Sequence, residues 1–135
     1  KKLKVIIKDA HTKAWYGFLV KAMGGVGIDR AQKNNLVKFV ADKFAKEDFS
    51  LVITPEGTRS WVPKWRKGFY NMAIEAKVPI VIAAGDFKNK TIHLGKQISV
   101  HDLETRSFES IMQELEDYYK TITPKYPEKW NPKIY

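Results

Sequence analysis

An α/β domain with a mixed, mostly parallel sheet flanked by helices is the fold class that this sequence predicts. Strand-like and helix-like apolar patterns alternate along the chain, which is typical of a sheet with helices packed on it. The segment 78–84 is almost continuously apolar, as expected of a buried parallel strand. With 135 residues the chain can bury a substantial core. We therefore expect a single domain over residues 1–135.

The first half of the chain predicts two strands and two helices. Its first segment is rich in β-branched residues, which indicates a strand. Apolar side chains then recur at helical spacing in two segments, and the pair Gly24-Gly25 ends the first of them. The expected elements are a strand at 3–7, a helix at about 15–22, a helix at about 31–46 and a strand at 49–53.

The second half predicts a polar loop over 54–68, followed by helices and strands. The last helix has the clearest apolar stripe, and the pair His101-Asp102 is expected in a turn before it. The expected elements are a helix at about 69–76, a buried strand at 78–84, two short strands at about 91–94 and 97–100, and a helix at about 107–122.

The composition narrows the classes of function. Lysine and arginine exceed aspartate and glutamate by 24 − 15 = 9, so the domain should attract nucleic acid, anionic lipid headgroups or phosphorylated metabolites. The absence of cysteine excludes disulfides, thiolate metal sites and a cysteine nucleophile. No apolar run approaches the roughly 20 residues of a membrane-spanning helix. No cluster of ligating side chains suggests a metal.

The most informative segment follows the strand predicted at 49–53. Pro55 and Gly57 suit a tight turn, and such a turn exposes backbone N–H groups. Thr58, Arg59 and Ser60 add hydroxyl and guanidinium donors, and a guanidinium can bind a phosphate through two parallel hydrogen bonds. The alternative is a strand-ending turn whose polar residues bind nothing.

A second candidate is Gly27-Ile28-Asp29-Arg30, placed at a junction between two predicted helices. Asp29 can cap the helix that begins near Ala31. Arg30 then lies in the first turn, where a cation is slightly unfavourable because the helix dipole is positive there. This placement suggests a functional role, although a purely structural one remains the alternative.

A third candidate is a basic loop that contains two tryptophans. Tryptophan beside lysine suits a membrane interface, and it also suits single-stranded nucleic acid, where the rings stack on bases. A third alternative is that the tryptophans pack back onto the core. The residues concerned are Arg59, Trp61, Lys64, Trp65, Arg66 and Lys67.

Taken in order and spacing, these motifs resemble the second, third and fourth sequence blocks of the glycerolipid acyltransferases, the family of the bacterial-type 1-acyl-glycerol-3-phosphate (lysophospholipid) acyltransferases. The resemblance extends from about Lys8 to Ala84 and implies a glycerol-3-phosphate acyltransferase-like domain. The matching blocks are Gly27-Ile28-Asp29-Arg30, Pro55-Glu56-Gly57-Thr58-Arg59-Ser60, Lys67-Gly68 and Val78-Pro79-Ile80-Val81.

The resemblance also implies roles for individual residues. Arg30 and Arg59 would hold the phosphate of the acceptor, Gly57 and Thr58 would contact it closely, and Glu56 would shape the acceptor site. Ser60 and Lys67 belong to the same substrate-binding set. The residues implied to support the motifs structurally are Asp29, Pro55, Gly68, Pro79 and Ile80.

The implied reaction moves a fatty acyl group from acyl-CoA or acyl carrier protein to a hydroxyl of a lysophospholipid or glycerol phosphate, in phospholipid biosynthesis. We expect a protein bound peripherally at the cytoplasmic side of the cell membrane, with no metal or redox cofactor and no nucleic-acid partner. The rival hypothesis is a basic nucleic-acid-binding module, although none of the usual signatures of such modules is present.

One block of the family, His-x-x-x-x-Asp, is missing. In the family this histidine is the general base, because a neutral imidazole can take the hydroxyl proton as the oxygen attacks. We expect the block to precede Lys1, and we assign no catalytic residue within the chain; the alternative is a non-catalytic lipid-binding relative. The residues five positions after the three histidines, His11, His93 and His101, are Tyr16, Ile98 and Arg106.

Overall fold

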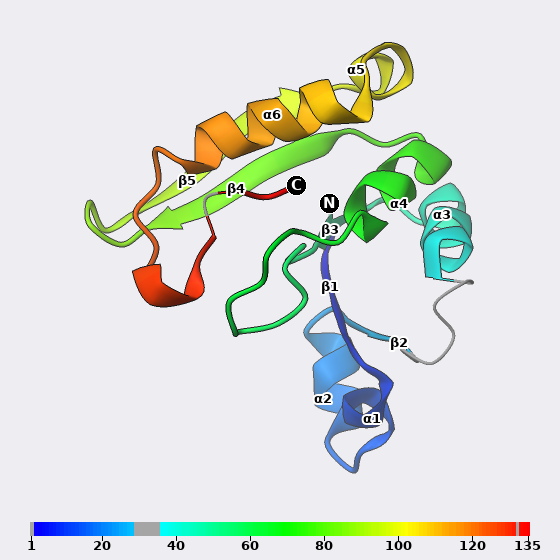
Figure 1. Ribbon diagram of the computed structural model, residues 1–135. Helices are drawn as coiled ribbons and strands as arrows, with labels where there is room; N and C mark the ends of the chain where they lie inside the picture. The colour runs from blue at the N-terminus through cyan, green and yellow to red at the C-terminus, as the bar shows by residue number, and fades with distance from the viewer. Residues whose placement is uncertain (1, 29–35, 132) are drawn as a thin grey trace. The chain divides into compact units, whose positions relative to one another are not determined.

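The computed structural model of the chain describes residues 2–28, 36–131 and 133–135 (Figure 1). Contacts divide the chain into two compact units, Lys1–Thr54 and Pro55–Tyr135, and each is described by itself. That residues 1–135 form a single domain stays a prediction. In the part of the chain that the structure describes, every helix is too short or too polar to cross a bilayer.

The first unit is built on a three-stranded parallel sheet with the order β2-β1-β3. Both outer strands pair in parallel with β1. Parallel neighbours require crossover connections, so helices come between them in the chain, and the predicted α/β class is confirmed. The elements are β1 (Lys2–Lys8), α1 (Asp9–Lys13), α2 (Gly17–Ala22), β2 (Gly25–Ile28), α3 (Leu36–Lys46) and β3 (Phe49–Val52).

The helix predicted at about 15–22 is confirmed as α2, although Trp15 lies before its start, and the short helix α1 that precedes it was not predicted. The apolar side chains of the predicted helix are not buried in this unit, since Trp15 is 90% exposed and Phe18 is 68% exposed. The predicted end is correct. Gly24 has a φ of +88°, and a Cβ there would lie 2.3 Å from the carbonyl oxygen of Leu3, so a side chain would be strained and would clash.

The prediction that Gly27 and Ile28 lie at a junction between two helices is wrong, because both residues belong to strand β2. A four-residue strand with two glycines has little intrinsic strand preference, and its pairing with β1 forms it. Asp29, Arg30 and the predicted start of the second helix lie outside the described residues. The apolar face predicted for that helix is confirmed at Val40, which is buried in α3.

The buried part of the first unit is small. The rings of Phe44 and Phe49 stack with their centroids 4.2 Å apart. The ammonium group of Lys4 lies 4.6 Å from the centre of the Phe49 ring and pairs with the carboxylate of Glu47. A strand at 49–53 is confirmed as β3, and Phe49 at its start is the residue that anchors it.

The second unit combines an antiparallel hairpin with helices. β4 and β5 pair in antiparallel fashion, and α6 lies along one face of the hairpin (Figure 1). The helices predicted at about 69–76 and 107–122 are confirmed as α4 and α6. The elements are α4 (Gly68–Ala76), β4 (Ile80–Asp86), β5 (Thr91–Ile98), α5 (Val100–Thr105), α6 (Phe108–Tyr119) and the 3-10 helix η2 (Pro127–Lys129).

The segment 78–84 is not the buried parallel strand that its apolar run predicts. Its strand, β4, pairs only with β5 among the described residues, and exposure alternates along it: Val81 is 53% exposed and Ile82 is 2% exposed. The two short strands predicted at 91–94 and 97–100 are one strand, β5. Gly95 hides this continuity in the sequence, but it lets the Tyr118 ring approach, because a Cβ there would lie 2.7 Å from the Tyr118 oxygen.

The turn expected at His101-Asp102 is a helix, α5. The Ser99 hydroxyl accepts from the Asp102 N–H at 3.0 Å, and the Asp102 carboxylate accepts from the Ser99 N–H at 3.0 Å. This reciprocal capping box satisfies two donors at the helix start, and the Ser-x-x-Asp spacing was the available signal for it. One hydrophobic cluster, formed by α4, the hairpin, α5, α6 and Ile134, makes up the core of this unit.

Candidate functional site

The loop 55–67 is closed by a hydrogen bond between its ends. The N–H of Arg66 donates to the carbonyl oxygen of Pro55 at 3.0 Å. Inside the loop, the N–H of Ser60 donates to the Thr58 hydroxyl at 3.2 Å, so a side chain shapes the turn locally. The turn predicted from Pro55 and Gly57 is therefore present as part of a closed loop.

Within this loop, the backbone at Gly57 lies close to the side chain of Arg66. Its φ of +69° lies in the left-handed region, which glycine adopts without strain. A Cβ at Gly57 would lie 3.0 Å from Nε and 3.2 Å from Cδ of Arg66, so the guanidinium group lies against the bare backbone of the turn. Sequence reasoning counted Arg66 in the basic loop but left it out of the substrate-binding set.

Two guanidinium groups of this loop are available for an anionic ligand. Arg59 and Arg66 are both exposed, and neither forms an ion pair within the described part of the chain. Thr58 and Ser60 are exposed beside Arg59. A closed turn with an exposed hydroxyl pair and free guanidinium groups has the donors that a phosphate group requires.

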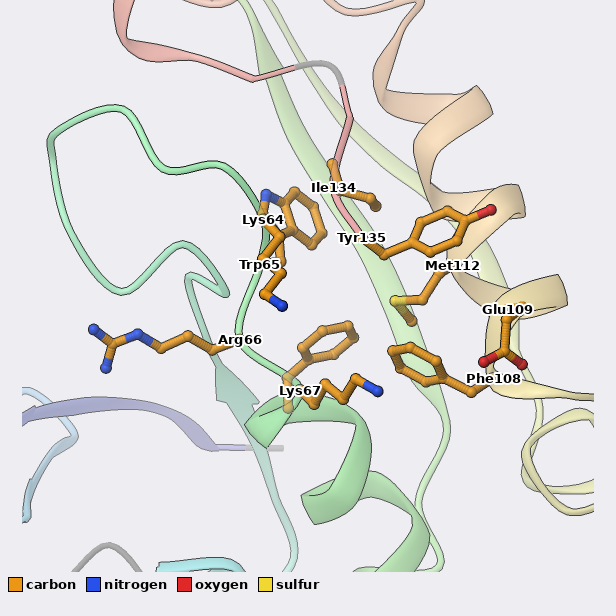
Figure 2. A pocket seen from close by; sticks show the side chains of 10 residues that line it. Lys64, Trp65, Arg66, Lys67, Phe108, Glu109, Met112, Ile134 and Tyr135 are labelled. Atoms are coloured by element: carbon orange, nitrogen blue, oxygen red, sulfur yellow. The ribbon is translucent and has the colours of Figure 1, made fainter.

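Lys67 is directed away from this turn. Its ammonium group lies 4.2 Å from the centre of the Phe108 ring, a cation–π contact with α6. It lines an open cleft of about 550 Å³ whose other walls include Phe69, Met112 and Ile134. Figure 2 shows Arg66 extending away from the remaining side chains of this cleft. In the structure, therefore, the Arg66 side chain lies against Gly57, whereas the Lys67 side chain lies against Phe108 of α6.

Glu56 is half-buried where the loop packs on the core. Burial raises the pKa of Glu56, because desolvation disfavours the charged carboxylate. Burial also raises the pKa of Tyr119, and the nearby charges of Tyr118 and Glu56 add to that shift. The Tyr119 hydroxyl donates to the carbonyl oxygen of Ala83 at 2.9 Å. Glu56 thus lies on the inner side of the loop.

The two tryptophans of the basic loop behave differently. The ring of Trp65 makes edge contacts with Tyr119 and Phe69, at centroid distances of 5.1 and 6.2 Å, so it packs on the core. Trp61 is 53% exposed. Of the alternatives considered for this loop, packing on the core describes Trp65, while Trp61 keeps a surface that a membrane or a base could contact.

The motif residues with implied structural roles are only partly explained by the fold. Gly68 begins α4, but a Cβ there would meet only Met72 at an ordinary 3.9 Å, so the backbone does not require glycine. Pro79 is exposed just before β4, and Ile80 packs against the core of the second unit. Asp29 and Arg30 lie outside the described residues, so their proximity to Arg59 stays a prediction.

The histidines are placed in regular structure. His93 lies on β5, where its Nε2 is 2.9 Å from the Thr91 hydroxyl, and His101 is exposed on α5. His11 belongs to α1. Among the residues with described positions, no three His, Asp or Glu side chains gather in a group that could hold a metal ion.

The fold is thus an α/β chain in which strand β3 is followed by a closed, glycine-containing loop, and the guanidinium groups of this loop lack ion-pair partners among the described residues. The protein-family model described as Acyltransferase matches residues 1–84, more than half of the chain. The chain therefore belongs to the acyltransferase family, and acyl transfer is the general reaction that this match supports. Searches of curated proteins and of solved structures gave no match.

Proposed function

We propose that the chain forms the acceptor-binding part of an enzyme that acylates a lysophospholipid or glycerol phosphate in phospholipid biosynthesis. The acyl donor is a thioester of coenzyme A or acyl carrier protein. The observation that carries this proposal is the loop 55–67, in which Arg59 and Arg66 lack ion-pair partners among the described residues and Gly57 presents bare backbone. This loop lies within the part of the chain that matches the family.

The phosphate of the acceptor is the group that this loop suits. Arg59 donates to phosphate oxygens from the outer side of the turn, and Thr58 and Ser60 offer hydroxyl groups next to it. Arg66, held against Gly57, supplies a second positive charge from the other end of the same loop. Each charge-assisted hydrogen bond is worth about 1.5–3 kcal/mol, so two guanidinium contacts suffice to orient a phosphate monoester.

Binding the phosphate fixes the position of the acceptor's hydroxyl group relative to the thioester. The residues of this chain therefore contribute orientation, which removes much of the entropic barrier of a two-substrate reaction. The deprotonating histidine of a His-x-x-x-x-Asp block is not contributed by the sequence in hand. The thioester supplies the driving force, so the proposal includes no metal and no redox cofactor.

The first unit supports a peripheral attachment to the cytoplasmic side of the cell membrane. Its α1–α2 region exposes large apolar side chains at Trp15, Phe18 and Met23, and Lys21 lies on the same short helix as Phe18. Aromatic rings at headgroup level beside a cation are typical of interfacial binding. We expect cosedimentation with vesicles that contain anionic lipid, and a Phe18→Ser variant should bind them more weakly.

The test of the proposed function is a comparison of ligands on the full chain by isothermal calorimetry. Lysophosphatidate and glycerol 3-phosphate should bind, whereas monoacylglycerol, which lacks the phosphate, should not. The Arg59→Ala variant should weaken binding, and Lys88→Ala, which removes a charge from the β4–β5 turn, should not. Equal binding of the phosphorylated and neutral ligands would contradict the proposal.

A second measurement addresses the nucleic-acid alternative. Titration with a single-stranded oligonucleotide at several salt concentrations should show weak binding, because the proposed site is specific for a phosphate monoester. Tight binding that falls steeply with salt, together with no effect of lysophosphatidate on thermal stability, would favour the nucleic-acid-binding module instead.

A further inference from the structure

A short segment near the end of the given sequence connects the loop 55–67 to helix α6. We call this segment the strap, and it comprises Asn131 and residues 133–135. It has no regular secondary structure, yet it contacts both the loop and the helix through hydrogen bonds and through one buried side chain. All of these contacts lie within the second unit.

On the loop side, the strap binds three backbone groups. The side-chain amide of Asn131 donates to the carbonyl oxygens of Val62 at 3.1 Å and of Pro63 at 2.7 Å. The carbonyl oxygen of Ile134 accepts from the N–H of Trp65 at 2.8 Å. The strap therefore binds the loop at three positions between Val62 and Trp65, where the chain forms no helix or strand.

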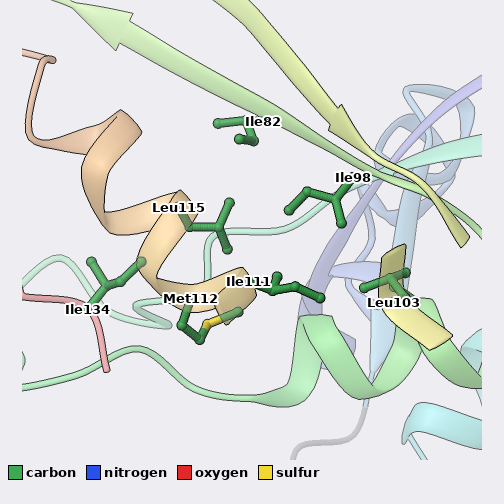
Figure 3. Close-up of a cluster of buried hydrophobic side chains, with 8 residues drawn as sticks. Ile82, Ile98, Leu103, Ile111, Met112, Leu115 and Ile134 are labelled. Atoms are coloured by element: carbon green, nitrogen blue, oxygen red, sulfur yellow. The ribbon is translucent and has the colours of Figure 1, made fainter. Parts of the chain in front are cut away.

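On the helix side, Ile134 is the anchor. Its side chain is 1% exposed and lies beside Met112 and Leu115 of α6, as Figure 3 shows. Its N–H donates at 3.1 Å to the carboxylate of Glu116, a residue that is only 7% exposed. The other oxygen of Glu116 pairs with Lys120 at 2.7 Å, so the buried carboxylate is satisfied on both sides.

The position of Arg66 depends on these contacts. The N–H of Trp65 is bound by the strap, and the N–H of the next residue, Arg66, is bound by Pro55. Two successive backbone N–H groups are thus bound by two different segments, at the point where the Arg66 side chain lies against Gly57. Release of Trp65 from the strap would leave the Pro55–Arg66 bond as the one described backbone bond that holds residues 65 and 66 in place.

We infer that the strap is a positioning element for the ligand-binding loop, with Asn131 and Ile134 as its positioning residues. Asn131 acts on the loop directly, and Ile134 transmits the fixed position of α6 to Trp65. The expected loss of affinity for a phosphate ligand rests on the proposed function. The expected loss of order in the loop does not.

The experiment uses Asn131→Asp in the full chain. This nearly isosteric change replaces the donating amide with oxygens that face two carbonyl oxygens, while the bond from the Lys133 N–H to the side-chain oxygen is kept. We expect faster amide hydrogen exchange in residues 57–66 and a roughly three- to tenfold weaker affinity for glycerol 3-phosphate, the loss that corresponds to one or two hydrogen bonds.

Thr121→Val is the control, because it removes the bond from the Thr121 hydroxyl to the carbonyl oxygen of Tyr118, which lies outside both the strap and the loop. Its loop exchange and ligand affinity should equal those of the parent chain. If Asn131→Asp does not fold, Asn131→Ala removes the same donor without adding a charge and should give the same two effects in smaller measure.

The outcomes separate the two claims. Unchanged exchange in the loop, or faster exchange without loss of affinity in a chain whose parent binds the ligand, would overturn the inference about the strap. Faster exchange in a chain whose parent binds neither glycerol 3-phosphate nor lysophosphatidate would refute the proposed function, and would leave the strap as the element that orders the loop.

Discussion

The two units of this protein differ in how much apolar surface they bury. In the first unit, Val40 and Phe49 are the buried hydrophobic residues among those described, although Leu3, Trp15 and Phe18 are available. Among its described residues, the second unit buries nine hydrophobic side chains and joins most of them in one cluster. Parallel strands usually need cover on both faces, and the first unit supplies little of it from its own side chains.

The recognisable motifs and the larger core overlap only in part, because the match includes Ala73 and Ile82 of the core but not its other members. The family match covers the first unit and ends inside β4, at residue 84. The helix α6, which contributes Ile111, Met112 and Leu115 to the core, lies entirely beyond it. The loop 55–67 therefore carries the matching motif but depends on unmatched residues for its support.

The largest effect is expected from a cavity in the second unit. Leu115→Ala should lower the free energy of unfolding of this unit by about 2–5 kcal/mol, because the residue is 2% exposed and the core cannot close fully around the gap. Leu19→Ala, in the first unit, changes a side chain that is 52% exposed and should cost much less. Denaturant unfolding monitored by hydrogen exchange would measure the loss of stability in each variant. Equal losses would contradict the difference in burial between the two units.

Removal of a guanidinium group tests the loop next. Arg59→Ala should weaken the binding of glycerol 3-phosphate by about 1.5–3 kcal/mol, the worth of one charge-assisted contact, with little change in melting temperature. Calorimetry on the variant and on the parent chain gives the difference. An unchanged affinity would mean that the phosphate binds elsewhere.

A smaller effect is expected at the turn itself. Gly57→Ala should destabilise the loop by about 1–2 kcal/mol, because alanine resists a φ of +69° and its Cβ would press on Arg66. Gly68→Ala is the matched control, since a Cβ there meets only ordinary contact distances. Hydrogen exchange of the loop amides should separate the two variants, and identical exchange would contradict the role given to Gly57.

The smallest effect concerns pH. The hydrogen bond from Lys120, with further help from the Ile134 N–H, holds the pKa of Glu116 below its ordinary value of 4.5. A lowered pKa contributes stability above the unfolded value, and this contribution is lost as the pH falls through the folded value. Protection of the strap amides, expressed relative to their intrinsic exchange rates at each pH, should therefore decrease below about pH 4.5, and Glu116→Gln should remove this dependence. Unchanged protection of the strap amides at acidic pH would argue against a stabilising hydrogen bond between the Ile134 N–H and the Glu116 carboxylate.

The sequence predicted the helices α2, α3, α4 and α6 and the strands β1 and β3, because each has a clear periodicity or a clear boundary. It failed where neighbours decide the structure. The glycine-rich strand β2 forms because β1 pairs with it, and the apolar run at 78–84 carries no sign of whether its partner is parallel or antiparallel. The start of α5 is encoded by the capping pair Ser99 and Asp102, and the expectation of a turn at His101-Asp102 takes no account of this spacing.

The candidate site was predictable in its position but not in its geometry. Pro55, Gly57 and Arg59 identified the turn from residue types alone. The contact of Arg66 with Gly57, and the rotation of Lys67 toward Phe108, depend on how the loop is closed and strapped. The strap contacts that support the loop join residues up to 69 positions apart, and no local pattern in a single sequence encodes them.

The most direct test of the account is an NMR titration of the full chain with glycerol 3-phosphate. Chemical shifts of the backbone amides from Gly57 to Ser60, and of the side chain of Arg66, should change most and should saturate together. Saturating changes confined to other segments, or none at ligand concentrations up to the millimolar range, would contradict the claim that this loop binds the phosphate.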